Sequence, residues 1–295
     1  MGHQPVLLAE VLDFLGSREE RNGVLVDATL GLGGHAEAFL DRFPEGVVVG
    51  LDRDAEILTE ARQRLGRFAG RVRFQHSTFA DLEAALDREG FDEVDAVLFD
   101  FGVSSPQLDR ADRGFSFRED GPLDMRMDRS EGESAADLIA RLRETELADL
   151  IYQLGDERAS RSIAAAIVRE RKKHRIETTG QLAEIVRGAV RGGGGRIDKA
   201  TRTFQALRMA VNCELEQIEA GLEAATRRLR PAGRLLAISF HSGEDRLVKN
   251  FLRSDERLDV LTKKVVRAGR EEVRTNPRAR SSRLRVAEKR GARVA

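Results

Sequence analysis

A group of polar, turn-forming residues in the first half of the chain has the composition of a reactive site. The apolar run Val94–Phe99 reads as a buried strand, and the segment Asp100–Gln107, with the sequence DFGVSSPQ, follows it directly. In an open α/β sheet, ligands bind outside the carboxyl ends of the strands. A carboxylate, a glycine and two hydroxyls at such an end therefore predict a binding or catalytic site.

Two earlier strands are also predicted to end in carboxylates. Asp27 lies at the end of the first apolar run and precedes the glycine-rich loop Gly31–His35, and Asp52 ends the run Val47–Asp52. Glycine lets a backbone turn tightly and approach a ligand at the start of a helix. Three polar strand ends within the first 107 residues predict that a nucleotide-type cofactor and a substrate meet at one sheet edge.

The glycine loop leaves two cofactors open. Gly31, Gly33 and Ala36 satisfy a dinucleotide fingerprint, and Asp52 lies near the spacing of a ribose-binding acid, so NAD fits the pattern. Asp27, however, would repel a pyrophosphate and could bind an ammonium group. S-adenosylmethionine carries an ammonium, a sulfonium and no phosphate, so we favour it over NAD. A merely tight turn is the alternative without a ligand.

Strands and helices alternate at first, which favours an α/β fold with a doubly wound, Rossmann-like parallel sheet. From 108 to 203 only helical patterns occur, so we predict an inserted all-helical domain there and a discontinuous core over 1–107 and 204–295. Thr178 and Gln181 predict a capping box. One long helix over 203–229, with Cys213 in its buried part, is expected to lead back to the core. The expected strands are 24–29, 47–52, 72–76, 94–100, 234–240, 258–266 and 283–287.

Composition narrows the class of protein. The chain has 295 residues, zero formal net charge and a single cysteine, which excludes an internal disulfide framework and fits a reducing compartment. We find no apolar run long enough for a membrane span and no signal-peptide pattern, and predict a cytoplasmic protein. The segment 262–295 nevertheless holds twelve basic and three acidic residues. Such a segment indicates either a polyanion partner or a solvated basic face.

Longer motifs resemble the RsmH (MraW) family across nearly the whole chain. These motifs are His3–Glu10, Asp27–His35, Asp100–Leu108, Arg113–Phe117, Gly121–Asp128, Thr201–Arg208, Ser239–Arg246 and Asn276–Ser282. The resemblance implies a class I methyltransferase core with an inserted helical domain, and S-adenosyl-L-methionine as cofactor. It also implies methylation of the exocyclic N4 of a cytidine in the decoding region of 16S ribosomal RNA, within the small ribosomal subunit. Members of the family are often homodimers.

The resemblance also implies roles for single residues. Gly33, Gly34 and His35 match the cofactor loop, and Asp52 matches the acid that binds the ribose. Further cofactor contacts are implied for Phe79, on the adenine side, and for Asp100 and Gln107. Two departures are visible: the stretch between Phe251 and Val266 is shorter than in some members, and Leu30 and Leu32 stand where many members carry Phe and Arg. The backbone geometry of the loop does not depend on those side chains. A lone phenylalanine such as Phe79 is more often a core residue.

The chemistry of an exocyclic amine adds expectations about catalysis. The amine lone pair is delocalised, so an acceptor must hold an N–H group and position the amine in line with the methyl group. We expect Asp100 or Ser105 to be that acceptor and His241 to move the proton, unless His241 is structural. No metal is required. For RNA contacts we single out three arginines, Arg113, Arg126 and Arg202.

Three other functions remain open. A DNA methyltransferase acting on N4 of cytosine or N6 of adenine would share the core, but the long motifs argue against it. A small-molecule methyltransferase would not need the basic segment. An assembly factor without catalysis would be expected to have lost cofactor residues, whereas Gly33, Asp52 and Asp100 are all present.

Overall fold

The computed structural model describes residues 5–16, 23–190 and 198–291. His3 and Gln4 of the first motif and Arg293 of the basic segment lie outside the described residues. The chain divides into two compact units, one made of 1–102 and 215–295 and the other of 103–214. We call them the core unit and the helical unit and treat each by itself.

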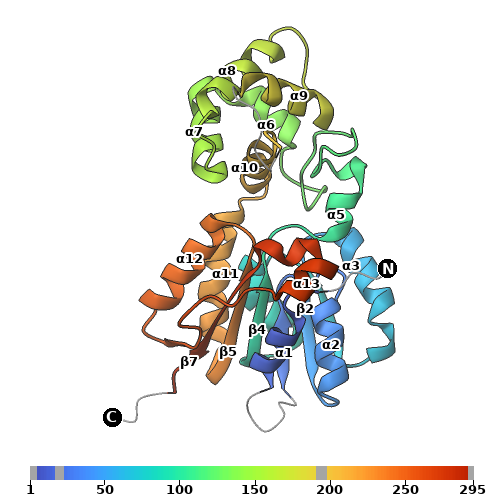
Figure 1. Cartoon of the computed structure of the whole chain (residues 1–295). Helices are drawn as coiled ribbons and strands as arrows, with labels where there is room; N and C mark the ends of the chain where they lie inside the picture. Colours follow the sequence, from blue (N-terminus) through green and yellow to red (C-terminus); the bar gives the residue numbers. More distant parts are fainter. Residues whose placement is uncertain (1–4, 17–22, 191–197, 292–295) are drawn as a thin grey trace. The chain divides into compact units, whose positions relative to one another are not determined.

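A seven-stranded sheet forms the centre of the core unit, in the order β3-β2-β1-β4-β5-β7-β6 (Figure 1). Strands β1 to β5 are parallel neighbours, whereas β7 is antiparallel to both β5 and β6. This topology is that of a class I methyltransferase and confirms the predicted fold class. The strands are β1 (Val24–Asp27), β2 (Val47–Asp52), β3 (Val72–His76), β4 (Val94–Asp100), β5 (Leu229–Ser239), β6 (Leu258–Val260) and β7 (Arg283–Lys289).

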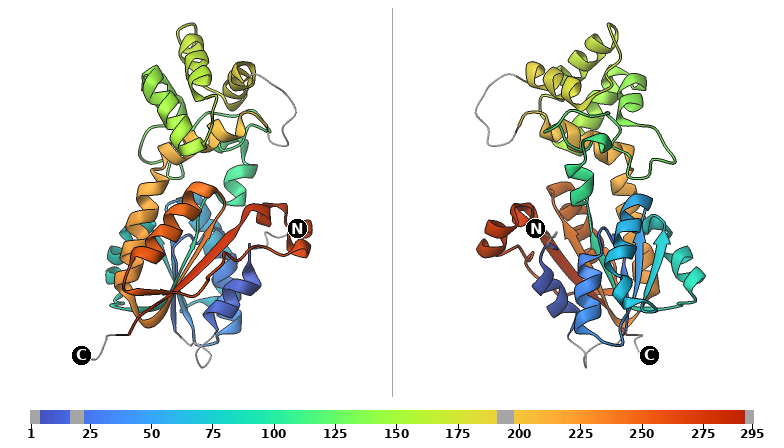
Figure 2. Two further views of the ribbon diagram at one scale, coloured as in Figure 1. Left: turned by 60° about the vertical axis from the view of Figure 1, so that its left-hand side comes forward. Right: turned by 90° about the vertical axis from the view of Figure 1, so that its right-hand side faces the viewer.

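Helices cover both faces of this sheet, as a doubly wound fold requires. Helices α1 (Leu8–Leu15), α2 (Gly34–Arg42) and α3 (Ala55–Arg64) contribute to one apolar cluster. The cluster on the other face includes side chains of α4 (Leu82–Glu89), α11 (Glu214–Arg228) and α12 (Ser242–Ser254). Figure 2 shows α1, in dark blue, and α12, in orange, on opposite sides of the strands. The core unit also contains η1 (Gly66–Phe68), η2 (Phe79–Asp81), α13 (Arg270–Thr275) and η4 (Pro277–Ser281).

The helical unit has an apolar cluster of its own. Thr178 caps α9 by accepting a hydrogen bond from the Gln181 amide, which confirms the capping box expected there. Among the described residues of this unit, β-pairing is limited to one bridge between Pro122 and Thr178. Its helices are α5 (Ser105–Asp109), η3 (Ala111–Arg113), α6 (Ala135–Arg141), α7 (Glu144–Gly155), α8 (Ser160–Arg171), α9 (Thr179–Ala189) and α10 (Thr201–Val211).

The single helix expected over 203–229 is wrong, because the structure has two helices there. Helix α10 ends at Val211, Cys213 adopts a positive φ of 48°, and α11 begins at Glu214. Cys213 is exposed at this break rather than buried within a helix. Phe204 and Leu207 of α10 pack in the cluster of the helical unit, so that unit extends to Glu214 and not to 203. The helical unit also begins at Val103, whereas the sequence predicts its start at 108.

Two strands also differ from expectation. Strand β5 begins at Leu229, ahead of the expected 234, and carries Ala232 at a φ of 62° beside a register shift against β4. The segment Pro231–Gly233 is therefore an irregularity inside this strand. Strand β6 ends at Val260, short of the expected 266, and an isolated bridge between Val266 and Leu284 follows it. Within the described ranges no helix is both long and apolar enough to cross a membrane.

Candidate active site

Three carboxyl groups meet at the carboxyl edge of the sheet because their strands are neighbours. Strand β1 lies between β2 and β4, so Asp27 stands between Asp52 and Asp100. Asp27 is only 1% exposed. The Asp100 amide donates a hydrogen bond of 2.6 Å to the Thr29 hydroxyl, which fixes the end of β4 against the residues that follow β1. The topology thus brings together the acids that the sequence places at three strand ends.

Burial changes the protonation of these acids. Desolvation raises the pKa of Asp100 to about 8, and the nearby charges of Asp27 and Glu244 add to the effect. Desolvation raises the pKa of Asp27 to about 7 and that of Asp52 to about 6, although backbone hydrogen bonds lower both. Carboxyl groups with raised pKa values at one edge favour a cationic ligand, because a positive charge stabilises their ionised forms.

Two oxygens in this group are buried without a partner. Asp27 Oδ1 and Asp100 Oδ1 have no hydrogen-bond partner among the described residues. Buried polar atoms are normally satisfied, so an unsatisfied pair at a strand edge indicates a site for a ligand's donors. An ammonium group carries such donors, and a sulfonium adds positive charge. These acceptor oxygens therefore fit the positive charges of S-adenosylmethionine and do not fit the pyrophosphate of NAD.

The glycine loop holds Asp52 in a defined orientation. Asp52 Oδ2 accepts a hydrogen bond of 2.8 Å from the Gly31 amide, and its Oδ1 accepts one of 2.9 Å from the Asp54 amide. Gly31 and Gly33 both adopt positive φ, at 52° and 76°. Asp54 caps α3 by accepting from the Glu56 and Ile57 amides, as its position predicts. Both Asp52 oxygens keep lone pairs that could accept from ribose hydroxyls.

We expect Gly33→Ala to weaken cofactor binding at least tenfold. An added Cβ would lie 2.7 Å from Leu65 Cδ1, and the φ of 76° costs an alanine about 1–2 kcal/mol. Calorimetric titration with S-adenosylmethionine measures the loss. Gly66→Ala is the matched control, because a Cβ there has no neighbour within 4 Å. Equal cofactor affinity for the two variants would contradict the assignment of the loop.

His35 connects the glycine loop to the start of the chain. Its Nε2 lies 2.9 Å from the Val6 carbonyl, and its Nδ1 lies 4.0 Å from Asp100 Oδ2. A Cβ on Gly34 would lie 2.5 Å from Pro5 Cγ, so this position needs a glycine. The segment Pro5–Leu7 therefore packs on the loop. This structural role of His35 was not expected, and its contact with the cofactor stays a prediction.

Phe79 belongs to an aromatic cluster at the edge of the core. Its ring centroid lies 5.7 Å from that of Phe99 and 5.8 Å from that of Phe101. The side chain is half-buried, so it joins the core and still has exposed area. The adenine contact stays a prediction that this placement permits.

His241 is held in place by Glu244, a residue in the first turn of the helix that follows it. The imidazole caps α12, with Nδ1 accepting from the Glu244 amide at 3.4 Å. Its Nε2 lies 2.8 Å from Glu244 Oε1, and the Glu244 side chain is fully buried. The other carboxylate oxygen of Glu244 accepts from the Phe240 amide at 2.8 Å. These contacts favour a positioning role for His241, and proton transfer by it stays a prediction.

Ser105 and Gln107 lie in the helical unit at the start of α5. Gln107 Oε1 accepts a hydrogen bond of 2.9 Å from the Ser104 amide, and Gln107 is 4% exposed. Ser105 is the first residue of this short helix and is also buried. Ser104 and Gln107 therefore form a capping box at the start of α5. The predicted cofactor contact of Gln107 and the catalytic role of Ser105 are not tested by these contacts.

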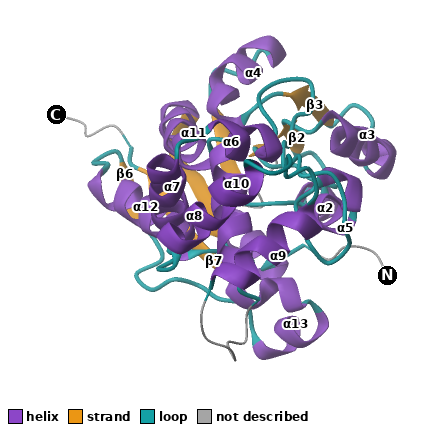
Figure 3. Cartoon of the chain, turned by 90° about the horizontal axis from the view of Figure 1, so that it is seen from above, coloured by secondary structure: helices purple, strands orange, loops and turns teal. Residues whose placement is uncertain are grey.

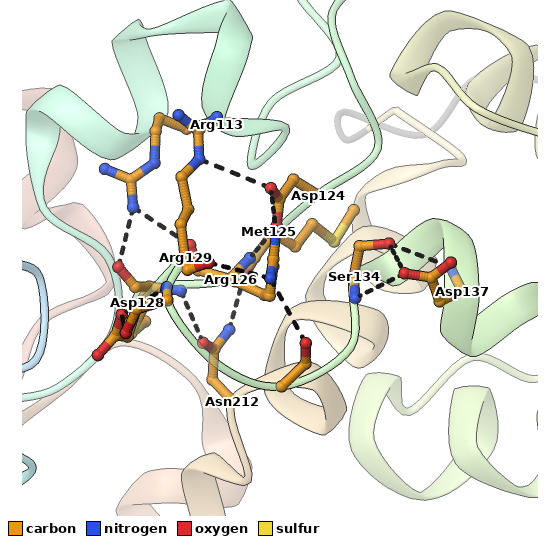
Figure 4. A network of polar contacts seen from close by, with 12 residues as sticks. Arg113, Asp124, Met125, Arg126, Asp128, Arg129, Ser134, Asp137 and Asn212 are labelled. Atoms are coloured by element: carbon orange, nitrogen blue, oxygen red, sulfur yellow. Dashed lines mark hydrogen bonds and ion pairs between the residues drawn. The ribbon is translucent and has the colours of Figure 1, made fainter.

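Arg113 does not fit the RNA contact expected for it. The residue is 1% exposed, and its guanidinium donates to the carbonyls of Arg126 and Met127 at 3.2 and 3.0 Å. Arg126 forms a two-point ion pair with Asp124 at 2.7 and 3.1 Å, and Asn212 bonds the backbone of the same loop. Figure 4 shows these side chains converging on the loop. Arg113 thus stabilises the loop from inside.

Arg126 and Arg202 keep exposed surface to different extents. The Arg126 side chain is 24% exposed and also donates to the Arg129 carbonyl at 3.1 Å, so much of its hydrogen-bonding capacity is used within the loop. Arg202 is exposed on α10 and donates to the Asp156 carbonyl at 3.0 Å. Of the three arginines, Arg202 is therefore the most accessible to a phosphate.

We expect Arg113→Ala to destabilise the helical unit by about 3 kcal/mol, because two partly buried carbonyls lose a charged donor. Urea unfolding followed by circular dichroism measures the change. Arg161→Ala, at an exposed position of α8, is the control and should leave stability unchanged. Native stability combined with weaker RNA binding in the Arg113 variant would restore the original expectation.

Comparison with known proteins gives one consistent result. The model of the MraW methylase family matches residues 1–290. A protein of Sorangium cellulosum named ribosomal RNA small subunit methyltransferase H is 51% identical over 98% of this chain and 91% of its own length. Proteins with the same name from Granulibacter bethesdensis and Geotalea uraniireducens are 46% and 47% identical, each over 97% of this chain and over 91% and 98% of their own lengths.

Proposed function

The chain belongs to the MraW methylase family, and on this premise we propose which methyl transfer it performs. The proposed reaction moves a methyl group from S-adenosyl-L-methionine to the exocyclic N4 of one cytidine in 16S ribosomal RNA. The relatives that are about half identical carry a name that specifies the small-subunit ribosomal RNA. The observation that carries the proposal is the cluster of Asp27, Asp52 and Asp100 beside a glycine loop.

The core unit supplies groups for each part of the cofactor. Asp52, oriented by two backbone amides, would accept from the ribose hydroxyls. Asp27 and Asp100 would face the positive charges, and Phe79 would lie against the adenine. When bound, S-adenosylmethionine supplies an activated methyl group. The positive φ values of Gly31 and Gly33 allow the loop backbone to approach the ligand without Cβ atoms.

Asp100 is the best-placed acceptor for the target amine. Its Oδ1 has no partner among the described residues, and a bound cationic cofactor would ionise the carboxyl group, so that this oxygen could accept an N–H group. An N–H group held by this oxygen would turn the amine lone pair toward the methyl group. The proton that must leave the methylated amine then passes to the same carboxylate. Ser105 is the second candidate acceptor, and Glu244 would keep the His241 ring in place.

The remaining partners follow from the proposed substrate. The helical unit, with Arg202 exposed on α10, and the basic segment after 262 would hold the RNA backbone. The target base must be splayed out of its stack to reach a pocket. Action on the small ribosomal subunit, a cytoplasmic location and a homodimer belong to this proposal as predictions.

Labelled cofactor tests the proposal directly. The protein is incubated with methyl-labelled S-adenosylmethionine and small ribosomal subunits from cells that lack the endogenous enzyme, and labelled nucleosides are identified by mass spectrometry. Label on N4 of one cytidine is the expected result. Label on another nucleoside would show that the target base is not this cytidine. If ribosomal subunits stay unlabelled and DNA offered in their place is labelled, the substrate is DNA. Absence of label despite measured cofactor binding would favour an assembly factor that retains the fold.

A further inference from the structure

A basic pocket lies in the core unit, separate from the carboxyl groups at the sheet edge. Its volume is about 220 Å³, and it is formed by α12, β6, β7 and the residues that follow β6. Leu252 and Val260 give it an apolar floor, Thr262 adds to its lining, and Lys249, Arg253, Lys263 and Arg285 provide its charge. Figure 3 shows α12 beside β6 at the end of the sheet where these residues lie.

One of these cations, Arg285, is neutralised and held in place by Asp245. Arg285 Nε and Nη2 donate to the two carboxylate oxygens of Asp245 at 2.7 and 3.2 Å. The Arg285 side chain is only 11% exposed. This two-point geometry leaves Nη1 of a rigid guanidinium as a donor for an incoming anion. Asp245 and Lys249 lie one helical turn apart, so Lys249 stands next to this ion pair.

The other three cations have no compensating group. Lys249, Arg253 and Lys263 form no hydrogen bond or ion pair within the part of the chain that the structure describes. Arg253 and Lys263 are exposed, and Lys249 is half-buried. Like charges around one pocket repel each other and are stabilised when an anion binds between them.

Further cations continue from the pocket toward the carboxyl edge of the sheet. The segment after β6 runs along β7, with amide–carbonyl bonds from Leu261 to Val286 and in both directions between Val266 and Leu284. Lys264, Arg267 and Arg270 are exposed on this course and have no partner among the described residues. A row of separate cations suits a polyanion better than it suits one small anion.

The strand register gives the separation between Asp100 and the strand that carries Arg285, one of the residues lining the pocket. Asp100 lies opposite Ile238, and Ile238 lies opposite Leu284, which precedes Arg285. Two strand spacings amount to roughly 10 Å. An extended strand of RNA could therefore have a phosphate in the pocket while a base a few nucleotides away reaches Asp100.

We propose that this pocket binds backbone phosphates of the RNA substrate a few nucleotides from the target base. The proposal rests on the function proposed above and adds a site in the core unit that anchors the strand. The cations would bind phosphate oxygens, and the apolar floor of Leu252 and Val260 would contact the adjoining ribose or base. The residues act on RNA position and not on the methyl transfer.

The test removes the three uncompensated charges together, as Lys249→Gln, Arg253→Gln and Lys263→Gln. We expect the KM for 16S ribosomal RNA to rise about 10- to 100-fold, and the slope of log affinity against log salt to fall by roughly 2. The KM for S-adenosylmethionine and kcat should change less than about twofold. Binding of a labelled, protein-free 16S fragment is measured at several salt concentrations beside the kinetics.

Two further variants of this chain test whether the effect is specific to the pocket. Removing three exposed cations from the opposite end of the sheet, as Arg62→Gln, Arg67→Gln and Arg88→Gln, should leave the KM for RNA unchanged. Exchanging lysine and arginine within the pocket, as Lys249→Arg, Arg253→Lys and Lys263→Arg, should restore most of the affinity. A thermal melt of each variant confirms that the fold is retained.

Three results would overturn the proposal. An unchanged salt slope in the pocket variant would show that no phosphate binds there. Equal losses in the pocket and control variants would indicate a general effect of net charge. Weaker binding to whole small subunits with normal binding to protein-free RNA would indicate an acidic ribosomal protein instead. If the labelled nucleoside is not a cytidine, the salt slope still reports on the pocket, so the two failures are distinguishable.

Discussion

Asp100→Asn is expected to lower kcat for methyl transfer by about 10²- to 10⁴-fold. The asparagine keeps the size of the side chain but can neither carry the negative charge nor accept the amine proton. The loss should therefore appear in kcat as well as in the KM for S-adenosylmethionine. Single-turnover methylation of small ribosomal subunits, at saturating cofactor, separates the two effects.

The same substitution should stabilise the cofactor-free protein at high pH. The pKa of Asp100 is raised from 3.8 to about 8 in the folded state. Between these values the folded protein keeps a proton that the unfolded chain has lost, so stability falls as pH rises from about 4 to 8. An asparagine removes this penalty, and we expect the melting temperature above pH 8 to rise by roughly 5 °C.

A control separates burial from charge. Asp13, whose side chain is 78% exposed, provides the matched substitution Asp13→Asn. This variant should keep native kcat and should show no gain in melting temperature at high pH. If Asp100→Asn loses activity without a stability gain above pH 8, the raised pKa is wrong. If it keeps full activity, Asp100 is not the acceptor.

Cofactor binding is expected to release between one and two protons near pH 7, and its affinity should fall by more than tenfold for each pH unit below about 7. Before a ligand binds at this pH, Asp27, with a pKa of about 7, is about half protonated, and Asp100, with a pKa of about 8, is largely protonated. A cationic ligand stabilises their ionised forms, so binding lowers both pKa values. Acidification opposes binding because the protons must leave first.

Calorimetry in two buffers with different ionisation enthalpies measures the released protons. Asp27→Asn should reduce the number released, whereas Asp13→Asn should not. S-adenosylhomocysteine lacks the sulfonium charge and should release fewer protons than S-adenosylmethionine. A dissociation constant that does not change between mildly acidic and mildly alkaline pH would contradict this account.

The strand ends of the core unit could be predicted from sequence for a physical reason. Buried parallel strands read as continuous apolar runs, so Val94–Phe99 and its counterparts stand out without any knowledge of tertiary contacts. Because ligands bind at the carboxyl ends of such strands, the residues that follow them identify the site edge. The acids Asp27, Asp52 and Asp100 and the glycine loop were found in this way.

Residues whose role depends on burial could not be predicted from sequence. Arg113 has the composition of an RNA contact, yet the loop folds around it and uses its guanidinium for two carbonyls. His241 has the chemistry of a proton shuttle, yet its Nε2 contacts the buried carboxylate of Glu244. The partners of such a side chain are distant in sequence or depend on the rotamer that it adopts. The spacing of neighbouring residues predicts neither the partners nor the rotamer.

The sequence by itself determined the α/β class, the order of the first strands, the acids at their ends and the glycine loop, because these depend on local apolar periodicity and residue type. Only the tertiary structure decided where the helical unit ends, since the positive φ of Cys213 interrupts a helical pattern that otherwise continues. It also decided the raised pKa values of Asp27 and Asp100, which arise from burial beside other carboxylates. The basic pocket likewise exists only because β7 runs antiparallel between β5 and β6 and brings Arg285 beside α12.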